Sequence, residues 1–282
     1  MQMNLVSICI PTYNGEKYLS DTLDSIICQS YTNFEIIIGD DSSEDNTFEI
    51  ISKYKNIIKQ PIKIFRNKRR LGIGANWNNS ITQATGKYIK MLFQDDIMMP
   101  TCLERFVQIL ESDPNIGLVA CKREFILDDD YRVEAENWLK LHENLQKSLM
   151  GSTFEDGILD KSFIKSKLFF TVPLNKIGEP SCTMFRRDLI QKVGYFNMKL
   201  RQKLDYEFYY RILKYTKIKV TEDKLVVFRL HSNQATVYNN RNHLDETSLY
   251  EMSMLKNMFW QLSFKQRLFL INNQIRILVK GL

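Results

Sequence analysis

The chain has 282 residues, of which 44% are hydrophobic and 26% are charged. This composition is that of a folded globular protein, and it excludes disordered, collagen-like and coiled-coil classes. The five cysteines stand far apart with no paired short spacing, so the sequence indicates neither a disulfide framework nor a structural zinc site. The cysteine pattern fits a reducing cytosol best. The length predicts one compact domain with an elaboration.

The net charge of +6 is concentrated in two stretches. Residues 50–94 carry ten Lys or Arg and no acid, and residues 252–282 carry five with no acid. Such stretches suit a phosphorylated ligand, an anionic membrane surface or nucleic acid, while a solvated basic face is the ordinary alternative. Because no nucleic-acid recognition motif accompanies them, we expect no nucleic-acid partner.

The sequence predicts a protein that does not span a membrane. No stretch reaches the roughly 18 to 20 apolar residues that a spanning helix needs. Met1–Ile10 lacks a basic leader and runs into Pro11, so we interpret it as a first buried strand rather than a signal peptide. We therefore expect a cytoplasmic protein.

Short apolar runs alternate with amphipathic stretches through the first 120 residues, which is typical of βαβ units and a mainly parallel sheet. The expected elements are strand 6–10, helix 19–27, strand 34–38, helix 45–54, strand 62–65, a helix after Gly74, strand 88–92, a helix opened by Pro100 and strand 117–120. Residues 131–176 follow no regular spacing, and we interpret them as an elaboration. Regular elements return as strand 181–185, helix 188–193, helix 204–215 and strand 226–230.

Three polar clusters follow predicted strands at their carboxyl ends, where ligands bind in open parallel sheets. They are Pro11–Asn14, Gly39–Thr47 and Gln94–Asp96. Adjacent acids such as Asp95 and Asp96 repel each other unless a cation or a donor-rich ligand lies between them. A hard divalent metal shared with a diphosphate would relieve that repulsion, and a helix cap is the ordinary alternative for one of the two acids.

These clusters, with Gly72–Asn78 and Gly86–Asp96, resemble the family 2 inverting glycosyltransferases of the GT-A fold. The resemblance covers most of residues 4–120 and continues more weakly through Gly178–Ser181 and Leu204–Glu207. It implies an α/β GT-A fold, with a Rossmann-like, mainly parallel central sheet and helices on both faces. An acceptor-side elaboration and C-terminal helices would complete that fold.

The resemblance divides the chain into three parts. Residues 1–120 would form the nucleotide-sugar-binding half, 121–235 the acceptor-binding and catalytic-base half of the same domain, and 236–282 a C-terminal helical segment. The implied activity is inverting transfer of a sugar from a nucleotide-sugar, foremost a UDP-sugar, to a hydroxyl of a glycan or lipid-linked glycan in surface-polysaccharide synthesis. The implied cofactor is Mn²⁺ or Mg²⁺.

The resemblance also implies roles for individual residues. Asp205 would be the catalytic base, and Asp95, Asp96 and His231 would hold the metal. Asp40 would accept the imide N–H of a uracil or thymine ring, which a carboxylate does well. The other residues implied in donor binding are Pro11, Tyr13, Asn14, Asp41, Arg66, Asn78 and Gln94, with Asp95 shared between donor and metal.

The sequence departs from the family pattern at three positions. Trp77 stands where an arginine usually precedes the asparagine, Phe93 where many members place the first acid of an Asp-x-Asp motif, and Leu204 where a glutamate commonly precedes the base. A non-catalytic nucleotide-sugar-binding descendant of the fold is therefore one alternative. A sugar nucleotidyltransferase is another, although Pro11–Glu16 is not the glycine-rich, lysine-containing loop expected of that class.

Two further expectations concern the second half of the chain. Asp205 opens a predicted helix, where capping is the ordinary alternative, and Glu207 is expected to point to another side of that helix and tolerate Gln. Residues 255–282 mix apolar side chains with cations and no acid, as an interfacial helix requires. A peripheral contact at the inner face of the plasma membrane and packing on the core or in a homodimer are both open.

Overall fold

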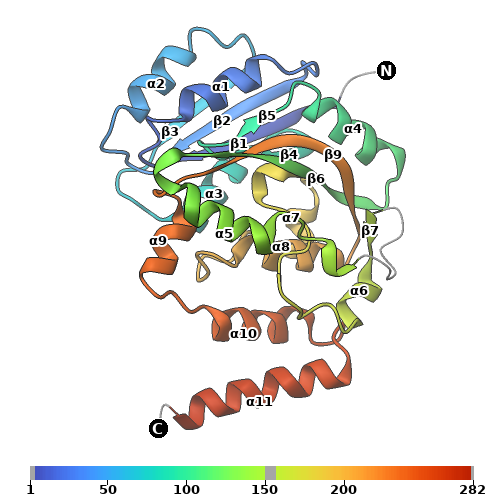
Figure 1. Cartoon of the computed structure of the whole chain (residues 1–282). Coiled ribbons are helices and arrows are strands. Elements are labelled where there is room, and N and C mark those ends of the chain that lie inside the picture. Colours follow the sequence, from blue (N-terminus) through green and yellow to red (C-terminus); the bar gives the residue numbers. More distant parts are fainter. Residues whose placement is uncertain (1–3, 150–156, 281–282) are drawn as a thin grey trace.

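The computed structural model describes residues 4–149 and 157–280, so residues 1–3 of the predicted N-terminal strand lie outside it (Figure 1). The strands in these ranges are β1 (Val6–Thr12), β2 (Phe34–Asp40), β3 (Ile62–Arg66), β4 (Tyr88–Met91), β5 (Ile97–Met98), β6 (Ile116–Leu127), β7 (Ile158–Leu159), β8 (Thr183–Arg186) and β9 (Lys217–Leu230). The helices are α1 (Leu19–Ile27), α2 (Thr47–Tyr54), α3 (Ile73–Thr82), α4 (Cys102–Ser112), α5 (Arg132–His142), α6 (Lys161–Lys165), α7 (Leu189–Val193), α8 (Leu204–Leu213), α9 (Ala235–Arg241), α10 (Thr247–Met258) and α11 (Phe264–Lys280).

All the described strands belong to one central sheet with the order β3–β2–β1–β4–β8–β6–β9–β5, and β7 also pairs with β9. Strands β3, β2, β1 and β4 run parallel, as predicted for the first half of the chain. Strand β8 is antiparallel to both of its neighbours, β4 and β6. The longest ladder, between β6 and β9, is again parallel, and the mixed α/β fold with a largely parallel sheet is confirmed.

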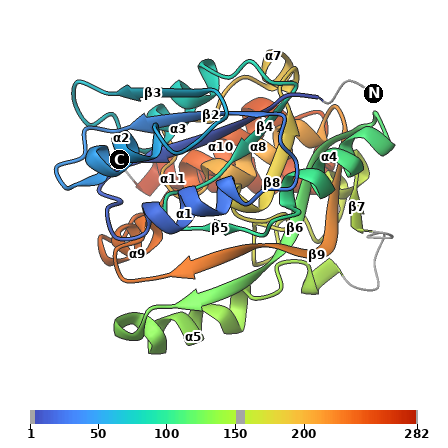
Figure 2. The same ribbon diagram turned by 90° about the horizontal axis from the view of Figure 1, so that it is seen from above.

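Helices cover both faces of the sheet (Figures 1 and 2). Helices α1, α2 and α4 lie on one face, and α3, α8 and α10 lie on the other. In β1, Val6, Ile8 and Ile10 belong to the core on the α1 side, whereas Cys9 belongs to the core that includes Phe208 of α8. Because successive side chains of a strand point to opposite faces, one short apolar run supplies both cores.

The structure differs from the predicted elements mainly in the length of two strands. Strand 117–120 extends to Leu127 in β6, and strand 226–230 begins at Lys217 in β9. The added parts carry Lys, Arg and Glu side chains, so they lack the apolar run by which a buried strand is recognised. They become strands because β6 and β9 pair with each other.

The segment 131–176, expected to be irregular, contains α5 and α6. Helix α5 buries only Ala135, so its sequence has little apolar periodicity to reveal it. Helix α3 begins at Ile73, whereas the sequence predicted a helix after Gly74, and Pro100 precedes rather than opens α4. None of the helices within 4–149 and 157–280 is long and apolar enough to cross a bilayer.

Candidate active site

The three polar clusters meet at the carboxyl ends of β1, β2 and β4. The Tyr13 N–H donates to Gln94 Oε1 at 2.8 Å, and Gln94 Nε2 donates back to the Tyr13 carbonyl at 3.0 Å. The Asn14 N–H donates to Ser43 Oγ at 3.0 Å, and the Glu44 N–H donates to Asn14 Oδ1 at 2.9 Å. The loops that follow these three strands are therefore joined into one surface.

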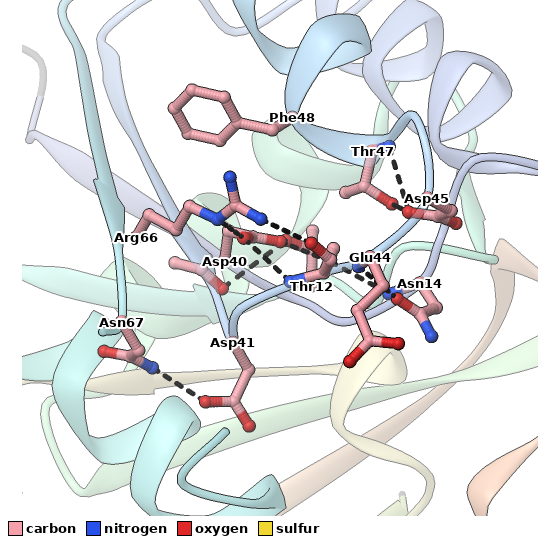
Figure 3. A network of polar contacts seen from close by, with 12 residues as sticks. Thr12, Asn14, Asp40, Asp41, Glu44, Asp45, Thr47, Phe48, Arg66 and Asn67 are labelled. Carbon is pink, nitrogen blue, oxygen red and sulfur yellow. Dashed lines mark hydrogen bonds and ion pairs between the residues drawn. The ribbon is translucent and has the colours of Figure 1, made fainter. Parts of the chain in front are cut away.

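Asp40 ends β2 as a fully buried carboxylate whose two oxygens are both engaged (Figure 3). One oxygen accepts the hydroxyls of Thr12, at 3.4 Å, and of Ser43. The other accepts the Ser43 N–H at 3.1 Å and lies 3.1 Å from Arg66 Nε. Asp40 and Arg66 are register partners in β2 and β3. Arg66, which the resemblance implies in donor binding, is therefore paired with the carboxylate expected to bind the uracil or thymine ring.

Asp41 is buried and holds the loop that leads into α3. Its carboxylate accepts the N–H groups of Leu71 and Gly72, both at 2.8 Å, and the side-chain amide of Asn67 at 2.9 Å. Gly72 has a φ of +91°, a conformation that favours glycine over residues with a side chain. Asp41 therefore fixes the shape of the loop formed by residues 67–72. We call it the basic loop, because it carries Lys68, Arg69 and Arg70.

That basic loop reaches back over the loop after β1. The Arg70 guanidinium lies 3.9 Å from the centroid of the Tyr13 ring, a cation–π contact. Pro11, the remaining predicted residue of this loop, lies inside β1 opposite Gly39 and is buried. The loops after β1 and β3 thus place the Tyr13 ring and the Arg70 guanidinium together, next to the contacts that Asp40 makes.

Asn78 does not lie among the three clusters. Its side-chain amide donates to the Phe196 carbonyl and accepts the Phe196 N–H, both at 3.0 Å, so it ties α3 to the loop before α8. The preceding Trp77 packs on Phe93, with ring centroids 4.8 Å apart, and on Phe196, at 5.2 Å. Trp77 and Phe93, two positions at which the sequence departs from the family pattern, therefore contact each other through their aromatic rings.

Asp95 and His231 form a close pair, with His231 Nε2 3.0 Å from Asp95 Oδ2. Asp96 is fully buried and accepts the Arg229 N–H at 3.2 Å. Burial, followed by the adjacent Asp95 charge, raises the pKa of Asp96 well above its usual range. This burial is unfavourable for the metal-ligand role predicted for Asp96.

A divalent ion fits the Asp95–His231 pair in its chemistry. No group of three or more His, Cys, Asp or Glu able to hold a metal occurs among the described residues. Mg²⁺ sites in phosphoryl chemistry, however, commonly use one or two carboxylates and take their other ligands from substrate phosphates and water. Imidazole nitrogen suits the transition metals, so the pair would suit a Mn²⁺ ion whose remaining ligands came from a diphosphate.

Asp205, in the first turn of α8, combines burial with an unused acceptor. Its Oδ2 accepts the Asn175 amide at 3.3 Å, whereas its Oδ1 has no hydrogen-bond partner among the described residues. Burial raises the pKa of Asp205 to about 7, and the Glu179 carboxylate adds to the rise. A carboxyl that titrates near neutral pH is suited to proton transfer.

Sequence reasoning missed Asn175, which orients that carboxyl. The Asn175 Oδ1 accepts the N–H groups of Ile177 and Gly178 at 2.9 and 3.0 Å, so its amide nitrogen is turned toward Asp205. Asn175 lies in the segment expected to be irregular, where no pattern could have singled it out. Thr12 and Ser43 were given no role either, although both lie within the predicted polar clusters.

The segment Gly178–Ser181, through which the resemblance continues, links Asp205 to the end of β4. Ser181 Oγ accepts the Phe93 N–H at 2.9 Å, which fixes the turn against the residues that follow β4. The Glu179 carboxylate acts electrostatically on both Asp96 and Asp205. The second half of the chain therefore brings Asp205 to the edge where the first half gathers its polar loops.

Comparison with known proteins identifies relatives over most of the chain. The family model for glycosyl transferase family 2 matches residues 7–194. A glycosyltransferase of Methanocaldococcus jannaschii is 30% identical over 259 residues, 91% of this chain and 80% of the relative. One of Haemophilus influenzae is 27% identical over 240 residues, 85% of this chain and 70% of the relative. Relatives from Mycobacterium tuberculosis and Rickettsia prowazekii are matched over 62% and 66% of their length, so the chain spans about two-thirds of such proteins.

Solved structures share the fold at low sequence identity. Staphylococcus aureus TarS 1-349 in complex with UDP has a TM-score of 0.65 at 19% identity, covering 97% of this chain and 71% of that chain. The mannosyltransferase PcManGT from Pyrobaculum calidifontis, in complex with GDP-Man and Mn²⁺, has a TM-score of 0.63 at 18% identity, covering 90% and 64%. With a family model matched from β1 through α7, across the loops that form this edge of the sheet, the chain belongs to glycosyl transferase family 2.

Proposed function

We propose that this chain is an inverting glycosyltransferase that moves a sugar from a nucleotide-sugar, most readily a UDP-sugar, to a hydroxyl group of an acceptor. The observation that carries the proposal is the state of Asp205. It is a buried carboxyl with a pKa near 7, one oxygen held by Asn175 and the other without a protein partner in the described structure. This is the arrangement that a general base for an incoming hydroxyl requires.

In this reaction Asp205 takes the proton of the acceptor hydroxyl as its oxygen attacks the anomeric carbon. The attack comes from the face opposite the diphosphate, so the new glycosidic bond forms as the bond between the anomeric carbon and the phosphate oxygen breaks. The nucleoside diphosphate leaves with the bonding electron pair, and the proton remains on Asp205. The configuration at the anomeric carbon is inverted.

Asp95 and His231 would hold the Mn²⁺ or Mg²⁺ ion, which when bound neutralises charge on the departing diphosphate. In the proposal Asp96 does not contact the ion. Its carboxyl is fully buried and accepts the Arg229 N–H. Asp95 therefore serves both donor and metal, and Asp96 supports the chain that leads to His231.

The donor half would be residues 1–120, with the acceptor half at 121–235. Tyr13, Asn14 and Gln94 join the loops that would frame the nucleoside, and the Asp40–Arg66 pair lies beside them. The complex of Staphylococcus aureus TarS 1-349 with UDP supports a uridine nucleotide. Asp41 and Asn78 would act through the segments they hold, the basic loop and the Phe196 loop.

A glycan or lipid-linked glycan at the inner face of the plasma membrane, in surface-polysaccharide synthesis, is the acceptor that we propose. The second candidate function is a non-catalytic nucleotide-sugar-binding protein. It is favoured by the Trp77–Phe93 contact, because these aromatic rings occupy positions where the family pattern has an arginine and an acid. The two candidates share donor binding and differ in turnover.

The test is a screen of UDP-, dTDP- and GDP-sugars with Mn²⁺, first by thermal shift and then by release of the nucleoside diphosphate. A bound donor should raise the Tm by mass action. A donor that both stabilises and turns over supports the enzyme, and one that stabilises without turnover supports the binding protein. Absence of any stabilisation across the three donor classes would contradict both.

A further inference from the structure

Helix α11 packs on the rest of the protein through its polar side. Gln266 donates to two backbone carbonyls at the end of α6, at 2.9 and 3.0 Å. Asn273 and Gln274 donate to the two carboxylate oxygens of Glu251 in α10, at 2.9 and 3.0 Å. Leu270 is the fully buried apolar residue of the helix. The side of α11 that faces the protein is therefore held largely by amide groups.

The apolar side of α11 faces away from the protein. Figure 1 shows α11 as the outermost helix at the lower edge of the molecule, beyond α10. Five apolar residues recur with spacings of four, three, four and three and so share one face. They are Phe264, Leu268, Ile271, Ile275 and Leu278, with exposed fractions from 38% to 75%. Trp260, just before the helix, is 78% exposed. This is the reverse of a helix that buries its apolar face in its own core.

The charged residues of α11 itself are all positive. Lys265 and Arg267 follow Phe264 at the start of the helix, and Arg276 follows Ile275 near its end. No Asp or Glu occurs anywhere from Met252 to the end of the sequence. An apolar stripe flanked by cations is complementary to an anionic lipid surface, which supplies both a hydrocarbon boundary and negative headgroups.

We propose that α11, with Trp260, docks on an anionic membrane surface. The same heptad spacing is compatible with a coiled coil, but paired helices usually place opposite charges beside the seam. Two copies of α11 would bring only cations together there, which opposes self-association. The lipid surface is therefore the occupant that fits both the apolar stripe and the charge.

This docking would place the membrane on the acceptor side of the molecule. Helix α10 lies between α11 and α8, where the Tyr250 ring packs 5.4 Å from that of Tyr206. Tyr206 directly follows Asp205 in α8. The consequence, which rests on the proposed function, is that an acceptor anchored in the same membrane approaches from the side that carries the base.

The experiment is sedimentation of the 282-residue chain with vesicles of phosphatidylcholine alone or mixed with phosphatidylglycerol. Binding should require phosphatidylglycerol and weaken with added salt. The double variant Lys265→Gln/Arg276→Gln should lower vesicle affinity by about 25-fold, since each cation near the surface contributes on the order of a fivefold factor. Ile271→Gln/Ile275→Gln, at exposed positions, should lower it at least as much.

The matched control is Val133→Gln/Leu141→Gln in α5, where two apolar residues are 68% and 65% exposed beside the acids Glu134 and Glu136. This variant should bind vesicles like the parent chain. Equal binding to both vesicle types, or no binding, would overturn the proposal. A dimer in sedimentation equilibrium that Ile271→Gln/Ile275→Gln abolishes, without vesicle binding, would assign the face to a second copy. Donor binding and release of the nucleoside diphosphate, both measured without vesicles, test the transferase separately, so the two proposals can fail independently.

Discussion

At the scale of single residues, the candidate site depends on where each carboxyl is buried. Asp205 keeps one oxygen without a partner in the described structure and titrates near neutral pH, whereas Asp40 has both oxygens engaged by Thr12, Ser43 and Arg66. Two buried aspartates therefore differ in what they can do. One carboxyl can exchange a proton, and the other organises the loops around it.

Asp205→Asn should lower sugar transfer by about 10² to 10⁴, because a general base contributes that much to the rate. Donor affinity should stay unchanged, since the substitution keeps the shape of the side chain. Sugar transfer and donor binding are measured side by side. Comparable transfer rates in the two proteins would move the base to another residue.

The same variant should change how stability depends on pH. A carboxyl whose pKa is raised by folding favours the folded state most when protonated, so its contribution is present at low pH and is lost as pH rises toward about 7. The Tm of Asp205→Asn should therefore exceed that of the parent chain by more at pH 8 than at pH 5. Melting curves at both pH values check this, and a difference that shrinks with pH would contradict the burial argument.

Asn175→Asp should shift the pH profile of transfer upward. The new carboxylate keeps the acceptor for the Ile177 and Gly178 N–H groups, but it replaces a donor to Asp205 with a like charge. The pKa of Asp205 should rise further, and the rising limb of the rate profile should move to higher pH. The measurement is transfer rate from pH 5.5 to 9, with donor affinity as the control. An unchanged limb would mean that Asn175 serves the loop alone.

Asp95→Asn and His231→Ala should weaken UDP binding mainly when Mn²⁺ is present. Both side chains belong to the 3.0 Å pair proposed to hold the ion. Calorimetric titration of UDP with and without Mn²⁺ separates loss of the ion from loss of direct contact. If the parent chain binds UDP equally with and without metal, the proposed metal site is wrong.

At the scale of elements, loops are held by single side chains rather than by their own sequence. Asp41 accepts two N–H groups of the loop before α3, and Asn78 holds both backbone groups of Phe196 before α8. Each contact joins segments that are far apart in the chain. The orientation of the basic loop over Tyr13 follows from the first of them.

Asp41→Ala should lower the free energy of unfolding by about 2 to 4 kcal/mol, because two N–H donors and the Asn67 amide lose a buried acceptor. It should also weaken donor binding by releasing Arg70 from its position over Tyr13. Asp41→Asn, which keeps one acceptor oxygen, should lie between the two proteins. Urea unfolding and UDP titration measure both effects, and full stability in the Ala variant would contradict them.

At the scale of the whole molecule, a buried ion pair joins the helices of the second half. Glu207 is fully buried, lies 3.0 Å from Arg211 and accepts the Ser253 hydroxyl of α10 at 2.5 Å. Arg211 in turn donates to the Val193 and Tyr195 carbonyls before α8. Glu207 therefore points into the core, and this burial argues against the expectation that it tolerates Gln.

Glu207→Gln should lower the free energy of unfolding by about 3 to 5 kcal/mol, since it leaves the Arg211 charge buried without its partner. Replacing both residues, as Glu207→Gln/Arg211→Met, should recover part of that loss. Chemical unfolding of the two variants and the parent chain provides the comparison. A single variant as stable as the parent would show that Arg211 finds other compensation.

The sequence by itself determined the alternation of strands and helices through residue 120 and the meeting of three polar clusters. Both follow from local pattern, because apolar periodicity reports a buried face and parallel strands end at the same edge of the sheet. Asp95 and His231 could be named as candidate residues from the sequence. Their 3.0 Å contact could be seen only in the structure.

Only the tertiary structure decided the contacts between distant segments. It extended β6 and β9, which stabilise each other despite polar sequences, and it placed Asn175 beside Asp205. It also turned the apolar side of α11 outward. A helical pattern shows that one face is apolar but not what covers it, because that depends on which groups the rest of the chain presents.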